Sequence, residues 1–221
     1  MKNVFKIAVI VALVTLCYEM VAQDAQPVNG QEFSPNGIEM IYVEGQGNIK
    51  SFYIGKYEVT HKVWTAVMGN PRSKDAIDDR PVDRTSWLDV QVFIKRLNEL
   101  SGRTYRLPTE AEWEFAAKGG TLSKGYKFSG SNTLAEVANI STNYATPPAV
   151  GGKKPNELGI YDMTGNVFEM CGDLYDSKSD VRVMRGGGVN FDKKFFPVEA
   201  RAGIYPGLVR VAVGFRLVLE P

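Results

Sequence analysis

The segment from Arg106 to Gly120, RLPTEAEWEFAAKGG, constrains the fold more than any other part of this chain. Its residues Thr109 and Glu112 have the spacing of a capping box, in which each side chain accepts a hydrogen bond from the backbone amide of the other. Pro108 disfavours helical geometry in the residue before it, and the two final glycines favour an end to the helix. Trp113 and two of the alanines that follow share one helical face. The segment therefore predicts a short helix that begins after Thr109, buries Trp113 and needs no reactive carboxylate.

Two further helices and a pair of strands are predicted from periodicity. Ser86 and Asp89 have a second capping-box spacing. The apolar residues after them recur on one helical face: Val90, Phe93, Ile94 and Leu97. Thr60 is placed to cap a shorter helix that carries Trp64. Residues 37–45 and 50–59 alternate apolar and polar side chains around a glycine-rich turn, which is typical of two paired strands.

The rest of the chain predicts long ordered loops and a closing strand. Residues 119–159 show little periodicity and contain many Gly, Pro, Asn and Ser residues, which favour turns. Residues 209–219, VRVAVGFRLVL, have the composition of a strand. Neither an internal repeat nor a change of composition divides the chain. We therefore expect one α+β domain with a large irregular fraction.

The N-terminus has the pattern of an export signal. Lys2 and Lys6 precede and flank the start of the apolar run Ile7–Leu16, which is too short to span a bilayer. Ala22 is a small residue at the expected cleavage position. We expect a protein that is secreted, periplasmic or held at the cell envelope after cleavage near Ala22. Cys17 leaves lipid anchoring open as an alternative, although the bulky leucine before it disfavours that modification.

The mature chain would consist of one domain behind a short lead-in. The expected divisions are a signal peptide at 1–22, a flexible lead-in at 23–36 and the domain at 37–221. Without the signal, acidic and basic residues are equal in number, and a chain without a positive excess is a poor partner for nucleic acid. Cys171 would be the one remaining cysteine, which excludes an internal disulfide.

Several segments together resemble one known family. Arg106–Gly120 closely resembles the hallmark sequence of the formylglycine-generating enzyme, or sulfatase-modifying factor, family. Further blocks resemble that family in the same order: EVTHKVW at 58–64, RPVDRTSWLDVQVFIKRLNE at 80–99, PNELGIYDMTGNVFEMCGD at 155–173, VMRGGG at 183–188 and VGFRLVLEP at 213–221. The resemblance implies the fold that this family shares with C-type-lectin-like domains. That fold has small twisted antiparallel sheets, two main helices and many ordered loops.

The resemblance also implies a catalytic feature that this chain lacks. Enzymes of the family oxidise a sulfatase cysteine to formylglycine with a pair of cysteines that bind copper, and the pair should lie within residues 189–201. That segment contains no cysteine, whereas copper(I) requires soft thiolate ligands. Cys171 lies elsewhere, and a related iron-dependent branch needs several histidines where this chain has only His61. We therefore expect no copper and a pseudoenzyme.

The loop YDMTGNVFE predicts a calcium site. Asp162 and Glu169 supply carboxylate oxygens, and Gly165 and Val167 supply main-chain carbonyls between them. Hard oxygen ligands in this mixture suit Ca²⁺. By resemblance, these four residues match a structural calcium site of the family. The alternative is a metal-free turn in which Asn166 adopts left-handed geometry and Glu169 pairs with an arginine.

The C-terminal segment contains candidate ligand-binding residues. Phe191, Phe195, Tyr205 and Arg210 combine aromatic rings with a cation, which suits a protein or glycan surface. We therefore expect a non-catalytic binding or scaffold domain that recognises a protein or glycan at the cell envelope. No transmembrane segment is expected in the mature chain.

Two alternative functions stay open at this point. One is a formylglycine-generating-type oxidase, or another enzyme with an atypical site. The other is a ligand-binding protein diversified by a retroelement, because such proteins use the same fold and vary in their last segment. Residues 202–205, AGIY, and 208–212, LVRVA, lie where that variation occurs.

Overall fold

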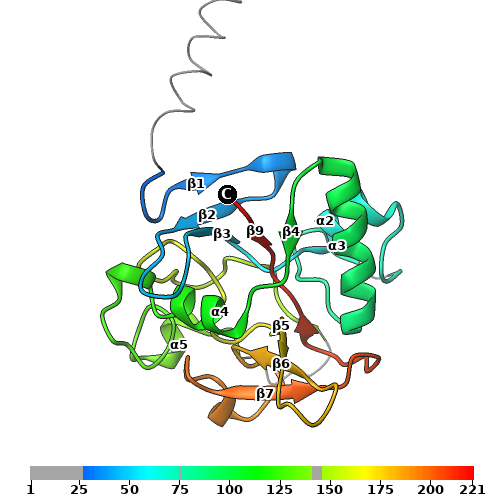
Figure 1. Cartoon of the computed structure of the whole chain (residues 1–221). Coiled ribbons are helices and arrows are strands. Elements are labelled where there is room, and N and C mark those ends of the chain that lie inside the picture. The colour runs from blue at the N-terminus through cyan, green and yellow to red at the C-terminus, as the bar shows by residue number, and fades with distance from the viewer. Residues whose placement is uncertain (1–26, 75, 141–145) are drawn as a thin grey trace, which may run out of the picture.

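The computed structural model describes residues 27–74, 76–140 and 146–221 (Figure 1). The predicted signal peptide and the first residues of the predicted lead-in lie outside this range. Within the described residues, two small sheets, four α-helices and long loops form the domain. This mixture confirms the expected α+β class.

The first sheet combines the N-terminal strands with two short strands from distant parts of the chain. Its strands, in spatial order, are β1 (Glu32–Phe33), β2 (Met40–Val43), β3 (Phe52–Gly55), β9 (Val218–Leu219) and β4 (Tyr105–Arg106). Every neighbouring pair is antiparallel, and β2 and β3 confirm the predicted strand pair. In β1, which lies within the predicted lead-in, Glu32 pairs with Ile41 and Phe33 with Met40. The sheet therefore begins before the expected domain boundary at Gly37.

Three of the four described α-helices begin at a side-chain cap that the sequence predicts. The helices are α2 (His61–Met68), α3 (Trp87–Ser101), α4 (Glu110–Ala117) and α5 (Leu134–Val137), with 3₁₀ turns η1 (Pro35–Gly37), η2 (Gly120–Leu122) and η3 (Lys193–Phe195). Thr60 caps α2. Both predicted capping boxes are present, Ser86 with Asp89 at α3 and Thr109 with Glu112 at α4. None of the helices in the described part of the chain is long and apolar enough to cross a bilayer.

The second sheet comes from the C-terminal half of the chain and contains one parallel pair. Its strands, in spatial order, are β7 (Arg201–Ile204), β6 (Arg182–Arg185), β5 (Phe168–Leu174) and β8 (Val213–Gly214). The β5–β6 and β6–β7 pairs are antiparallel, whereas β5 and β8 run parallel. The expected antiparallel pairing is present, and this edge adds one parallel contact, because the chain returns from β7 through the loop 205–212 instead of a tight hairpin turn.

The C-terminal segment is shared between the two sheets. Residues 209–219, predicted as one strand, form β8 and β9 with a separate stretch between them, so the prediction of one strand is wrong. In that stretch, the carbonyl of Phe215 accepts a hydrogen bond from Val59, and the carbonyl of Leu217 accepts one from Gly55. These bonds hold the stretch against the end of β3 and place Arg216 between the sheets.

Two large clusters of buried apolar side chains stabilise the domain. In the first, α2 and α3 lie side by side next to the first sheet (Figure 1). Trp64 stacks on Phe93 with 5.2 Å between ring centroids, and Phe93 meets Phe215 edge-on at 5.3 Å. The second cluster contains Trp113, which is fully buried as predicted. Burial of each such large side chain contributes about 2–3 kcal/mol.

Candidate functional site

Residues 189–201, where the family resemblance places the copper-binding cysteines, are packed without a thiol. η3 turns the chain there, and Phe196 directly after it is fully buried. Cys171 lies in β5, completely buried and unpaired. Burial, together with the nearby Glu169 carboxylate, raises the pKa of Cys171 well above its ordinary value. A buried, protonated thiol is a poor nucleophile and a poor ligand for a soft metal.

The glutamates of α4 are bound by arginines. Arg106 donates one hydrogen bond of 2.7 Å to each carboxylate oxygen of Glu112. Arg185, whose side chain is almost fully buried, donates to Glu110 at 2.7 Å and to Glu114 at 2.6 Å. Charge-assisted pairs of this kind fix the orientation of both partners. The carboxylates of this helix are therefore part of the scaffold.

The centre of the domain contains a buried ion pair that joins β5 to the stretch between β8 and β9. Arg216 donates to Glu169 through Nε and Nη2, each at 2.6 Å, and Trp113 donates its indole N–H to the same carboxylate at 2.6 Å. Arg216 also donates to the main-chain oxygens of Gly55 and Tyr161, at 2.7 and 2.9 Å. Neither charged side chain has any exposed surface. One set of charge-assisted hydrogen bonds thus connects both sheets and α4.

Two more buried carboxyl groups lie beside this ion pair. Glu58 accepts hydrogen bonds from the side-chain amide of Asn166 at 2.6 Å and from the backbone amide of Val167 at 3.1 Å. Asp162 accepts hydrogen bonds from the backbone amide of Gly151 at 2.6 Å and from the side-chain amide of Asn139 at 3.4 Å. Burial, and then the neighbouring carboxylates, raise the pKa of Glu58 well above its ordinary value, and burial also raises the pKa of Asp162. Three carboxyl groups therefore face one guanidinium, and the excess charge is costly to bury unless a proton or a cation compensates it.

The four residues predicted to bind calcium belong to this region: Asp162, Gly165, Val167 and Glu169. The excess of carboxyl groups suits a hard divalent cation. Glu169, however, already accepts three hydrogen bonds from Arg216 and Trp113, which leaves it one of about four lone-pair positions. Among the described residues, no three His, Cys, Asp or Glu side chains are grouped as metal ligands. A calcium ion here would therefore depend on main-chain oxygens as well.

The same loop also has the two features of the metal-free alternative. Asn166 adopts a φ of 57°, in the left-handed region, and Glu169 pairs with Arg216. The excess of buried carboxyl groups favours a bound cation, whereas the hydrogen bonds of Glu169 favour its ion pair with Arg216 and no metal. Calcium at this loop stays a prediction.

Two of the four residues predicted to bind a ligand are packed against the interior. The rings of Phe191 and Phe195 meet Phe168 edge-on, with centroid distances of 4.7 and 5.5 Å. Both side chains are half-buried and extend the first apolar cluster. These aromatic rings therefore contribute to the packing around β5.

The other two predicted ligand-binding residues, Tyr205 and Arg210, lie in the loop between β7 and β8 and are exposed. Tyr205 is 62% exposed, and Leu208 and Val209 also present large apolar side chains to solvent. Exposed apolar residues that lie close together on a folded domain are candidates for a contact site.

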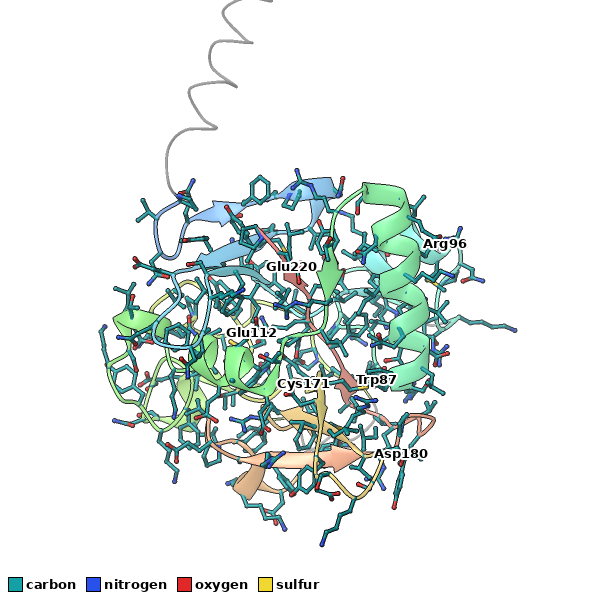
Figure 2. All side chains as sticks on the ribbon, viewed as in Figure 1. Trp87, Arg96, Glu112, Cys171, Asp180 and Glu220 are labelled. Carbon is teal, nitrogen blue, oxygen red and sulfur yellow. The ribbon has the colours of Figure 1, made fainter. Side chains whose placement is uncertain are left out.

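The loop lies against the N-terminal end of α3. The amide of Leu88 donates to the carbonyl of Pro206, and the amide of Arg84 donates to the carbonyl of Arg210, both at 3.2 Å. Leu88 and Val92, on the outer face of α3, are 54% and 58% exposed. Figure 2 labels Trp87 at this end of the helix, next to the loop. The exposed apolar residues of these two adjoining segments are named the apolar patch: Leu88, Val92, Tyr205, Leu208 and Val209.

Arginines border the apolar patch. Arg84 and Arg210 are exposed on the segments that the two backbone hydrogen bonds join. Arg182 lies over the ring of Trp87, with 4.2 Å between the guanidinium carbon and the ring centroid. A partner that combines apolar side chains with carboxylates would complement this arrangement.

The sequence pattern did not predict the contribution of α3 to this surface. Periodicity assigned four residues of the helix to its inner face, and all four are buried. Leu88 and Val92 lie off that face, and apolar residues on the outer face of an amphipathic helix are the signal that would have indicated a contact surface. Arg216 was likewise not identified, because its partner Glu169 is distant in sequence.

The family match and the similar proteins point to the same family. Residues 29–221 match the family described as sulfatase-modifying factor enzyme 1-like domain. The chain is 32% identical over 223 residues to the chaperone protein LppX of Paenibacillus barcinonensis, a match that covers 76% of this chain and 79% of that protein. It is 31% identical over 156 residues to inactive C-alpha-formylglycine-generating enzyme 2 of Bos taurus, which covers 62% of this chain and 49% of that protein. The chain thus spans about half the length of the bovine relative.

Solved structures share the fold. Treponema denticola variable protein 1 has a TM-score of 0.74 at 26% identity, and the match covers 89% of this chain and all of that one. PvdO from Pseudomonas aeruginosa has a TM-score of 0.73 at 21% identity and covers 89% of this chain, a likeness that concerns the fold alone. From the family match and these relatives, the chain belongs to the sulfatase-modifying factor, or formylglycine-generating enzyme-like, family.

Proposed function

We propose that this protein is a non-catalytic binding domain that recognises another protein through the apolar patch. The observation that carries this proposal is the exposure of Leu88, Val92 and Tyr205 on two segments that backbone hydrogen bonds hold together. Apolar area removed from water by a partner contributes about 25 cal/mol per Å². The bordering arginines favour a partner that carries carboxylates. Aliphatic side chains predominate in the patch, which favours a protein over a glycan as the partner.

The absence of a cysteine pair from residues 189–201 supports binding over oxidation. Residues 189–201 contain no cysteine, and burial raises the pKa of Cys171 well above its ordinary value. An oxidase of the family type would need two accessible thiolates to hold copper. An enzyme with an atypical site is therefore the less favoured function.

The similar proteins support the same class of function. One relative is named a chaperone and another an inactive formylglycine-generating enzyme. A structural neighbour is named a variable protein, and this favours retroelement diversification as a second candidate. Tyr205, Leu208 and Val209 of the apolar patch fall within the segments 202–205 and 208–212, where such variation would occur.

We also propose that recognition takes place outside the cytoplasm, at the cell envelope. The support is the sequence pattern of residues 1–22, which lie outside the described residues. Cleavage near Ala22 would release the domain, and N-terminal sequencing of the protein purified from its own cells would locate that cleavage.

The binding proposal is tested by recovery of partners from a cell-envelope extract. The bait is the chain without residues 1–22, and the test variant is Leu88→Ser with Tyr205→Ser. A matched control replaces exposed apolar residues elsewhere, Ile77→Ser with Leu122→Ser, each 48% exposed in the parent protein. We expect the control to retain the partner and the test variant to lose it by about tenfold or more, as for hot-spot residues.

Two outcomes would change the binding proposal. Equal recovery of every partner by the test variant and the control would contradict it. Loss of recovery after enzymatic deglycosylation of the extract would assign a glycan in place of a protein.

We further propose that a structural calcium ion binds at Asp162, Gly165, Val167 and Glu169. The excess of buried carboxyl groups supports it, and the ion would supply fixed positive charge without redox chemistry. Calcium is expected to raise the Tm above that measured in chelator, because a ligand that binds only the native state stabilises it. Asp162→Ala should lose that difference, and Asp180→Ala, at an exposed position, should keep it. If the Tm of the parent protein is the same in calcium and in chelator, the calcium proposal is contradicted. Protonation of the buried carboxyl groups would then balance their charge.

A further inference from the structure

A cavity of about 720 Å³ opens between α2, the C-terminal end of α3 and the turn η1. Its volume lies in the range of sites that bind small molecules. None of the five residues of the apolar patch is among the described residues that line it. The cavity is therefore a second candidate site, separate from the proposed protein-binding surface.

The inner wall of the cavity is apolar. Val63 and Val67 of α2 and Leu97 of α3 line it. Val67 and Leu97 are buried members of the first apolar cluster, so the cavity reaches the core of the domain. Ala66 and Leu100, which are exposed, line it nearer to solvent. An apolar group that enters this space leaves water and contacts a preformed wall.

Carboxyl groups outnumber cations around the cavity. Among the described lining residues, Glu39, Glu58 and Asp79 carry carboxyl groups, and Lys62 carries a cationic group. Glu39 also binds Lys56, with 3.0 Å between the carboxylate and the ammonium nitrogen. Asp79 is exposed, so its carboxylate is accessible to a ligand.

We propose that this cavity binds a small amphipathic cation, with an apolar body against Val63 and Leu97 and a positively charged amine beside the carboxylates of Glu39 and Asp79. An anion of the same shape is disfavoured by the same carboxylates. A neutral molecule of that shape gains only the apolar contribution. This inference does not depend on the protein-binding function proposed for the apolar patch.

The test compares three probes that share one straight alkyl chain: n-octylamine, n-octanol and n-octanoate. Binding to the chain without residues 1–22 is measured at neutral pH by calorimetry, below the concentrations at which the probes aggregate. We expect saturable binding of octylamine, about tenfold tighter than that of octanoate, because a single favourable charge interaction of moderate strength has that effect. Asp79→Asn should reduce this preference several-fold and leave octanol binding unchanged.

A second pair of variants locates the site. Ala66→Trp fills the cavity from its exposed side and should abolish saturable octylamine binding. Ala111→Trp adds the same ring at an exposed position of α4 and should leave binding unchanged. Methyl NMR of the parent protein gives the same information without substitution. Octylamine should shift the methyl signals of Val63 and Leu97 and leave those of Leu208 unchanged.

Three results would overturn the inference. The first is the absence of saturable octylamine binding in the parent protein. The second is equal affinity for octylamine and octanoate, which would remove the role of the carboxylates. The third is octylamine binding that persists in a folded Ala66→Trp variant or that shifts Leu208 in place of Val63, which would place the site elsewhere.

Discussion

Glu169 and Arg216 at the centre of the domain are charged and have no exposed surface, whereas Val92 and Tyr205 at its edge are apolar and more than half exposed. Both regions therefore reverse the usual distribution of side chains. The charged residues accept or donate several hydrogen bonds each and join elements that are distant in sequence. The apolar patch lies outside the packed interior.

This difference separates the residues that build the scaffold from those available for binding. A buried ion pair requires good geometry on every side, because desolvation of each charge is costly. Such a pair therefore specifies how the two sheets and α4 meet. An exposed apolar residue adds little to the stability of the domain, so its side chain is suited to an external partner. Substitutions in the two regions should have opposite effects on stability and binding.

The largest effect is expected from Arg216→Met. The substitution leaves the Glu169 carboxylate buried without its cation, which is expected to lower the free energy of unfolding by about 3–5 kcal/mol. Urea unfolding measures the change. Lys95→Met is the matched control, since Lys95 forms an exposed pair with Glu99 at 4.0 Å, and should change stability by no more than about 0.5 kcal/mol.

A double variant sharpens the same test. Glu169→Gln with Arg216→Met removes both charges and should be more stable than Arg216→Met alone. If Arg216→Met is no more destabilising than the Lys95 control, the buried pair does not hold the scaffold together, and the contrast between the two regions fails.

An intermediate effect, dependent on pH, is expected from Glu112→Gln in α4. Burial by itself raises the pKa of Glu112, but hydrogen bonds from Arg106 and Thr109 outweigh burial and hold the pKa below its ordinary value. A lowered pKa in the folded state stabilises the protein above the ordinary glutamate pKa, and this stability is lost as the pH falls through the folded-state pKa. Glu112→Gln should therefore cost about 1–2 kcal/mol at neutral pH and much less in acid.

The measurement for Glu112→Gln is urea unfolding at several pH values. Glu99→Gln, at an exposed position of α3, is the control. Its difference in free energy of unfolding from the parent protein should be the same in acid as at neutral pH. A difference between parent and Glu112→Gln that grows as the pH falls would contradict the assigned direction of the pKa shift.

The smallest change in stability is expected from Leu88→Ser with Tyr205→Ser. Both side chains are more than half exposed, so the free energy of unfolding should change by no more than about 0.5 kcal/mol for each substitution. Binding to the partner should nevertheless be lost. A thermal scan of this variant next to the partner-recovery experiment distinguishes the two effects. A large decrease in Tm would show that the patch is part of the packed domain.

Local features of this protein were predictable from the sequence. The capping boxes at Ser86 and Thr109, the strand pair β2–β3 and the burial of Trp113 depend on residues that are close together along the chain. Tyr205 and Arg210, proposed from the sequence as ligand-binding residues, are exposed, and their role in binding stays a prediction. Composition alone did not distinguish them from Phe191 and Phe195, because aromatic residues serve equally well in a core and at a binding surface.

The sequence by itself determined the helix caps, the family resemblance and the lack of cysteines at 189–201. Tertiary structure alone decided the pairing of Glu169 with Arg216, the parallel contact of β5 with β8 and the meeting of Leu88 with the loop at Tyr205. The physical reason is the range of each interaction. Caps and hydrophobic periodicity act over a few residues, whereas ion pairs and exposed patches depend on which distant segments the fold brings together.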